Sequence, residues 1–211
     1  MASLNENGSL TDLVNSALVG IGDNTIENLM DANDGKAKLC RLLVTQCIRE
    51  VQGHPSACWS ELDTYEILVP NDRAYRDDAP SYNVPKDCLS IRWVKDGNNL
   101  RIPYKVSARS LKTPYRAKHI CYVRFSDNPE EWSSELKSCV IGLLSAKLLA
   151  AIAKDYTASR QAVDSFWMVE FPRWAGNRMN HSDNAVPGKD SELSELFGED
   201  PHSALHAKDW I

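Results

Sequence analysis

Apolar residues near the start of the chain recur with the period of a helix. They occupy one stripe of a 3.6-residue period at Leu10, Leu13, Val14, Ala17, Leu18 and Ile21. Ser9 is expected to cap the first turn, and Gly22 is expected to supply the left-handed residue after the last turn. A second helical pattern runs from Ala37 to Val51 and ends at Gly53. The first quarter of the chain is therefore predicted to be helical.

The period changes from 3.6 to 2 at Tyr65, which predicts strands. Tyr65, Ile67 and Val69 open this stretch. Further strands are expected at residues 89–93, 100–106 and 119–125. The turn between the expected strands 89–93 and 100–106 contains Gly97, which tolerates the positive φ of a hairpin. The segment 71–85 is predicted to be a long excursion between strands, so the middle of the chain is expected to form a small antiparallel sheet.

Helical signals return after the strands. Asp127 or Asn128 is expected to cap a helix that has Pro129 at its first position, and this helix is expected to run to about Lys154. Thr157 is expected to cap a fourth helix, which Pro172 should kink or stop because proline lacks an amide donor.

The order of these elements predicts an α+β fold that is mainly α. We expect a helical bundle built from the N- and C-terminal halves, with a small antiparallel β insertion and an extended C-terminal arm. The expected divisions are 9–60 with 127–175 for the helical core, 61–126 for the β-rich insertion and 176–211 for the arm.

Composition is typical of a folded chain without a membrane span. The 211 residues are 43% hydrophobic, and the longest apolar run, 140–153, is shorter than the roughly 20 residues needed to cross a bilayer. Residues 1–8 lack the pattern of a signal peptide, so we expect a protein made and kept in a cytosol. The six cysteines include no C-x-x-C pair and are expected to be reduced and buried.

Charge is distributed unevenly along the chain. The net charge is −5, yet residues 91–125 hold nine basic residues and one acidic residue, which gives +8 there and −13 elsewhere. Such sorting indicates that two faces meet different partners, or that copies meet face to opposite face. The candidate contact residues in this stretch are Arg101, Lys105, Arg109, Lys112, Arg116 and Lys118. They suit phosphates or an acidic protein face, although a solvated basic surface has the same composition.

Residues for catalysis or metal binding do not converge in the sequence. There is no glycine-rich phosphate cradle, and only His202 and His206 have the i,i+4 spacing of paired ligands, without a third ligand nearby. His54 and Cys58 come nearest to a thiol–imidazole couple, but a helix end and core packing explain them as well. We expect no enzyme activity, no metal and no cofactor.

The chain after Met179 is acidic and sparsely apolar. Its apolar residues are Leu193, Leu196, Phe197, Trp210 and Ile211. Two interpretations stay open: a disordered terminus, or an arm that becomes ordered against a partner.

Several short segments, taken in order, resemble one protein family. They are Leu13–Leu18 with Ile21–Asp23, then Asn33–Ala37, Cys58–Trp59, Tyr65–Leu68, Tyr82–Leu89 and Trp132–Ala153. Across residues 10 to 172 this order resembles the tail tubular protein A family, the adaptor or head-to-tail connector proteins of short-tailed bacteriophages.

The resemblance implies a structural virion protein that catalyses nothing. It implies a twelve-subunit ring beneath the portal that joins the capsid to the tail nozzle and surrounds the DNA exit channel. The implied partners are other copies, the portal protein, the nozzle protein and non-specific double-stranded DNA, with no membrane. The implied location is the tail or neck of the virion, after synthesis in the host cytoplasm. The apolar arm residues would bind the portal, and the six basic residues would contact subunits, nozzle or DNA.

Two alternatives stay open at this point. One is a head-completion connector of a long-tailed phage. The other is a nucleic-acid-binding module that uses residues 91–125.

Overall fold

A computed structural model describes residues 6–57, 59–71 and 80–175 of the chain, with side chains from residue 10 onward. These residues form two compact units. The α unit comprises 6–57, 59–63, 87–90 and 123–175, and the β unit comprises 64–71, 80–86 and 91–122. The predicted arm, 176–211, lies outside the described residues.

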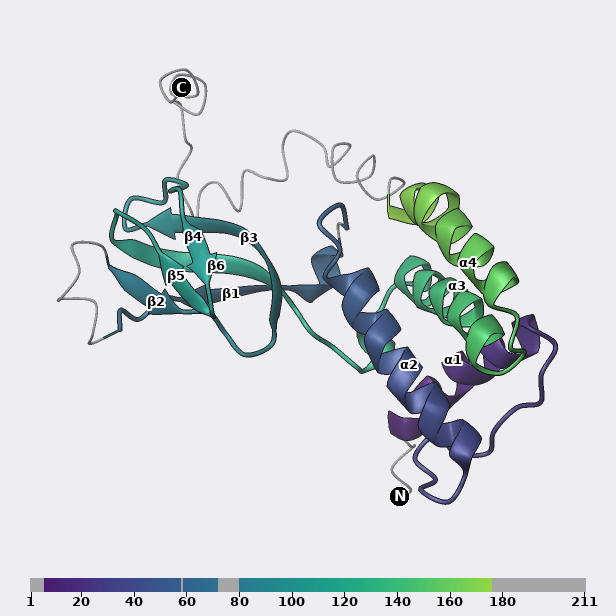
Figure 1. The fold of residues 1–211 in the computed structure, drawn as a ribbon. Coiled ribbons are helices and arrows are strands. Elements are labelled where there is room, and N and C mark those ends of the chain that lie inside the picture. The colour runs from purple at the N-terminus through teal and green to yellow at the C-terminus, as the bar shows by residue number, and fades with distance from the viewer. Residues whose placement is uncertain (1–5, 58, 72–79, 176–211) are drawn as a thin grey trace. The chain divides into compact units, whose positions relative to one another are not determined.

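The α unit is organised around one central helix. Its helices are α1 (Glu6–Gly20), α2 (Gly35–Gln52), α3 (Ser134–Ala151) and α4 (Tyr156–Ser165), with short 3-10 turns at Ser60–Leu62 and Pro129–Glu131. Helix α3 packs against α1, α2 and α4 (Figure 1). Buried apolar residues of α1, α2 and α3, together with Phe166, Phe171 and Ala175 from the segment after α4, form a single core, and Trp59 lies fully buried within it. The indole of Trp59 donates to the carbonyl of Val51 at 3.0 Å, so its one polar atom is satisfied.

The ends of the first two helices largely follow local sequence signals. Gly22 has a φ of +76° and donates to Val19, while Asp23 donates to Leu18, the two bonds of a Schellman ending. Helix α2 ends at Gln52 with Gly53 as its cap, and both glycine predictions are confirmed. The prediction that Ser9 starts the first helix is wrong, because α1 already begins at Glu6.

The third helix begins later than its start signal predicts. Asn128 caps only the 3-10 turn Pro129–Glu131, and Trp132 then takes an extended conformation. Helix α3 starts two residues further on, where the Ser133 hydroxyl accepts from the Leu136 amide at 3.2 Å. Trp132 is buried, so burying its large side chain takes the backbone off the helical path and moves the helix start.

The fourth helix differs from its prediction at both ends. Asp155, not Thr157, caps α4 by accepting from the amide of Ala158 at 2.9 Å. The chain then forms a π-helical segment, Phe166–Glu170, in which Phe171 donates to the carbonyl of Phe166. Helical structure continues through residues 171–175, so Pro172 does not stop the helix. The wider π turn immediately precedes the proline, as expected where a regular helix would clash with the ring.

Six strands form two sheets. The strands are β1 (Asp63–Ile67), β2 (Ser81–Asn83), β3 (Cys88–Asp96), β4 (Lys105–Ser107), β5 (Ser110–Lys112) and β6 (Ala117–Arg124). One sheet has the order β1-β6-β3 and the other β2-β5-β4 (Figure 1).

The predicted fold class, a mainly α helical bundle with a small β insertion, is wrong. The described structure is about 46% helix and 21% strand with two three-stranded antiparallel sheets, which makes it a mixed α+β fold. Strand β2 falls in the predicted excursion 71–85, and β5 lies where no strand is expected. Each has three residues, too few to show a period of 2 in the sequence, and each exists because a neighbouring strand pairs with it.

The predicted strand over 100–106 is divided in the structure. Arg101 makes one isolated bridge to Lys95, and β4 begins only at Lys105, beyond Pro103. The turn before it also differs from its prediction, because Asn99, not Gly97, takes the positive φ of 66°. The carboxylate of Asp96 accepts from the amides of Asn98 and Leu100 and holds this turn together.

Candidate functional site

The two units carry opposite charges. The described residues of the β unit include nine basic and two acidic side chains, a formal charge of +7. The described sequence of the α unit includes ten basic and 17 acidic residues, a formal charge of −7. The mildly acidic average of the chain therefore hides a separation of charge between two folded bodies.

The register of the second sheet sorts its side chains by polarity. Across the β4–β5 hairpin, Lys105 lies opposite Lys112 and Ser107 opposite Ser110, while Val106 lies opposite Leu111. Opposed residues share a face, so one face carries lysines and hydroxyls and the other carries apolar side chains. Strand β2 extends both faces: Ser81 and Asn83 join the polar face, and Tyr82 joins Leu111 in the core.

Lys105 and Lys112 are two like charges placed directly across a hairpin. The Cα atoms of opposed residues in such ladders lie about 4.5 to 5.5 Å apart, so both ammonium groups are able to reach a shared ligand. Like charges in this arrangement destabilise a hairpin. Neither lysine forms an ion pair with any other residue that the structure describes. An anion between them would offset their repulsion.

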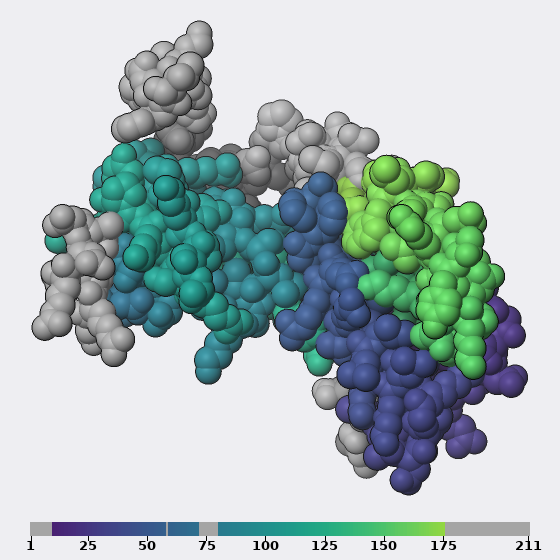
Figure 2. Space-filling view, viewed as in Figure 1, coloured from purple at the N-terminus to yellow at the C-terminus, as the bar shows by residue number. Residues whose placement is uncertain are grey.

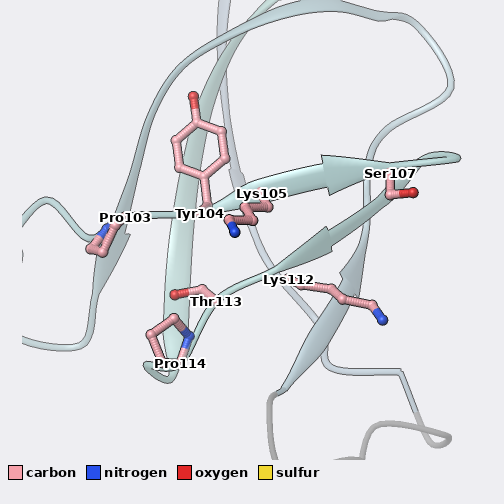
Figure 3. Close-up of a pocket in the computed structure, with 7 residues that line it drawn as sticks. All are labelled: Pro103, Tyr104, Lys105, Ser107, Lys112, Thr113 and Pro114. Carbon is pink, nitrogen blue, oxygen red and sulfur yellow. The ribbon is translucent and has the colours of Figure 1, made fainter.

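A hollow of about 530 Å³ opens beside these two lysines (Figure 3). It is lined by Pro103, Tyr104, Lys105, Ser107, Lys112, Thr113 and Pro114. The proline rings, the tyrosine ring and the aliphatic stems of the lysines make its walls mostly apolar. The ammonium groups of Lys105 and Lys112 point away from each other in Figure 3. The arrangement suits a ligand that presents an apolar group beside a negative charge.

Arg109 has a structural task in the same hairpin. Ala108 and Arg109 form the two-residue turn with φ values of 47° and 65°, both in the left-handed region. The Arg109 guanidinium donates to the carbonyl of Lys86 at 2.7 Å, and the Arg109 carbonyl accepts from the amide of Val84 at 3.0 Å. These two bonds attach the turn to the segment after β2.

The other three predicted basic residues lie on other elements of the β unit. Arg101 is exposed and faces Lys95 in the isolated bridge. Arg116 is exposed in the connection between β5 and β6, and Lys118 is exposed on β6. The hairpin thus brings together Lys105, Lys112 and Arg109, whereas the remaining three are spread over the unit.

Sequence reasoning missed the polar residues that accompany the lysines. Ser81 and Ser110 belong to strands that were not predicted, and the turn Ala108-Arg109 lacks the Asn-Gly or Asp-Gly signal of a tight hairpin. The sequence does hold one signal for this arrangement. Lys105 and Ser107 precede the dipeptide Ala108-Arg109 at the same spacing at which Ser110 and Lys112 follow it, so a symmetrical hairpin places serine opposite serine and lysine opposite lysine.

The residues considered for chemistry have packing roles where the structure describes them. His54 stacks on Trp167 at 5.0 Å and meets the edge of Phe171 at 4.5 Å, and burial lowers the pKa of its imidazole. Cys40, Cys47, Cys121 and Cys139 are buried outside any disulfide, as predicted, whereas Cys88 is free but only half-buried, so the prediction of burial is wrong for it. Burial raises the pKa of the Cys47 and Cys139 thiols to about 12.

Several predicted residues lie outside the described part of the chain. They are Cys58, His202, His206, Leu193, Leu196, Phe197, Trp210 and Ile211. Within residues 6–57, 59–71 and 80–175, no group of three or more metal-ligating side chains comes together. No helix in this part of the chain is long and apolar enough to span a membrane.

Comparison with protein-family models and with curated proteins finds no match to this chain. The fold and the site define an α+β protein in which a basic β unit, with an open hollow beside paired lysines, accompanies an acidic α unit.

Proposed function

We propose that this protein is a structural virion adaptor, a subunit of a twelve-membered ring that joins the portal to the tail nozzle and surrounds the DNA exit channel. The supporting observation is the charge of +7 on the described β unit and −7 on the described α unit. Contact between the β unit of one copy and the α unit of the next pairs opposite charges, whereas contact between like units opposes them. Head-to-tail contacts of this kind form a ring when the rotation from one copy to the next closes.

The proposal assigns roles to the two predicted groups of residues. The arm residues Leu193, Leu196, Phe197, Trp210 and Ile211 would bind the portal. The hairpin lysines and the other exposed basic residues would contact a neighbouring subunit, the nozzle or the phosphates of DNA. These roles need no catalytic group and no cofactor, and they place the protein in the neck of the virion.

Electron microscopy of the purified protein mixed with rings of the portal protein from the same genome tests this function. We expect a ring of added subunits on each portal. Leu196→Asp is expected to abolish docking, because it puts a charge at an apolar anchor, while Ser194→Asp in the same segment is the matched control. A protein that ignores portal rings and binds duplex DNA with a steep salt dependence would instead favour the nucleic-acid-binding alternative.

A further inference from the structure

An apolar stripe lies exposed on strand β1 and on the residues just after it. Tyr65, Ile67 and Val69 are spaced two residues apart and are 67%, 68% and 73% exposed. Alternation along an extended chain puts all three on one face. The period of 2 predicted this strand, but such a pattern ordinarily marks the face that is buried in the core. Here the apolar side of the strand faces outward within the single chain.

The register of the sheet holds the stripe in this orientation. The intervening residues, Glu66 and Leu68, point to the opposite face. The hydroxyl of Tyr122 donates to the Glu66 carboxylate at 2.7 Å, Leu68 is buried, and the Leu68 amide donates to the carbonyl of Lys118 at 2.9 Å. Turning the stripe inward would break these contacts and carry a carboxylate to the other side of the sheet.

The stripe also lies at the edge of its sheet. In the order β1-β6-β3, strand β1 has a neighbour on one side only. The ring of Tyr65 lies 5.8 Å from that of Trp93, and the Lys95 ammonium lies 4.8 Å from the centre of the Trp93 ring. We name Tyr65, Ile67, Val69 and Trp93 the β1 patch. It is an apolar surface with a basic border, on the basic unit, and an exposed apolar edge of this kind is typical of a contact site.

The α unit also presents an exposed apolar surface. Met168 and Val169 are 81% and 63% exposed and belong to the π-helical segment. The C-terminal part of the described chain, which contains this segment, is light green in Figure 2. Asp164 lies four residues before Met168 and shares its helix face, and exposed Glu170 follows Val169. Exposed Arg173 lies four residues after Val169, and exposed Arg160 lies four residues before Asp164. Methionine adapts readily to a partner surface, and π-helical segments are frequent at functional sites. This surface is therefore apolar, has neighbours of both charges, and belongs to the unit whose net charge is negative.

We infer that the β1 patch of one copy docks on the Met168–Val169 surface of a second copy. The inference builds on the proposed function, since it names the contact between neighbouring subunits of the ring. Because the two surfaces differ, the contact is heterologous and leaves a free surface of each kind for the next copy. The β1 patch has four residues, whereas a stable interface takes about 20 to 30 residues from each partner. Single contacts are thus weak, and the ring is stabilised only when all of them form on the portal.

Ring assembly on the portal tests this contact by substitution. Ile67→Asp and Met168→Asp are each expected to lower the yield of portal-bound rings at least about tenfold, because each puts a charge at the centre of an apolar contact. Val106→Asp and Tyr156→Asp are the matched controls, since Val106 and Tyr156 are 50% and 73% exposed on strand β4 and helix α4. Circular dichroism and thermal unfolding of each variant check that the fold is retained. Rings formed equally well by Ile67→Asp would overturn the inference.

Photo-crosslinking identifies the occupant of the patch. A benzophenone amino acid at position 67 is introduced into unlabelled protein, which is mixed with ¹⁵N-labelled protein, and the crosslinked peptides are sequenced by mass spectrometry. Crosslinks from unlabelled to labelled chains within residues 164–170 support the inference. Crosslinks within one chain, to residues 176–211 or to the portal overturn it. The crosslinking experiment is also carried out on concentrated protein without portal. The contact between copies is therefore tested even if no rings form on the portal, a result that would contradict only the proposed function.

Discussion

At the scale of single residues, Gly22 shows how a local signal becomes structure. Its φ of +76° lies in the left-handed region, where a Cβ atom is strained, and nothing lies within 4 Å of a Cβ added there. The free-energy cost of a side chain at this position therefore comes from the backbone conformation and not from crowding by neighbouring atoms.

Gly22→Ala is expected to lower the free energy of unfolding by about 1 kcal/mol, because alanine resists the left-handed conformation. Urea denaturation followed by circular dichroism measures this change in the free energy of unfolding. Gly20→Ala is the control, since a Cβ there meets Ser145 at an ordinary 3.5 Å and the residue lies within α1. Equal losses in the two variants would contradict the role given to the positive φ.

At the scale of elements, the β4–β5 hairpin combines strain with anchoring. A two-residue turn with positive φ at both positions favours Asn-Gly, and here it is Ala108-Arg109. The Arg109 guanidinium offsets part of this strain through its bond to the Lys86 carbonyl at 2.7 Å. The hairpin is therefore held by a side-chain contact where most such turns depend on backbone preference.

Ala108→Asn is expected to raise the free energy of unfolding by about 0.5 to 1 kcal/mol, because asparagine tolerates the left-handed region and the Ala108 side chain is exposed. Thermal and urea unfolding measure the change. Ala57→Asn provides the contrast, since that alanine is fully buried and the same exchange there is expected to destabilise the fold. A loss of stability in Ala108→Asn would contradict the assigned turn.

At the scale of the whole molecule, the separation of charge is the property that bears most on assembly. The described units carry +7 and −7, so contacts between unlike units of neighbouring copies are attractive over distances comparable to the screening length. The apolar β1 patch supplies a shorter-ranged contact within the basic unit.

Salt is expected to weaken ring assembly on the portal. Raising sodium chloride from about 0.05 M to about 0.5 M should lower the assembled fraction several-fold, since screening shortens the reach of exposed charges. Analytical ultracentrifugation or mass photometry measures the fraction. Assembly that is unchanged or stronger in high salt would indicate that apolar contact alone joins the copies.

Much of the fold could be predicted because its signals are local. The apolar period and Gly53 predicted helix α2 and its end, alternation predicted β3, and the run from His119 to Phe125 predicted β6, since these features depend on residues close together in the sequence. The six basic candidate residues were visible as a cluster of charge. Their arrangement in space could not be predicted, because Lys105 lies opposite Lys112 only through a hairpin whose turn has no glycine signal.

The sequence by itself determined the two helical regions, the strand-forming middle and the uneven charge, because period, caps and composition are properties of neighbouring residues. The tertiary structure alone decided the start of α3, the existence of β2 and β5, and the face of β1 that points outward. Each of these depends on a partner far along the chain. The start of α3 depends on the burial of Trp132 in the core, and strand β2 depends on its pairing with β5. Glu66 likewise depends on the hydroxyl of Tyr122. Contacts between residues so distant in sequence leave no periodic trace, because each side chain satisfies a neighbour that only folding brings near.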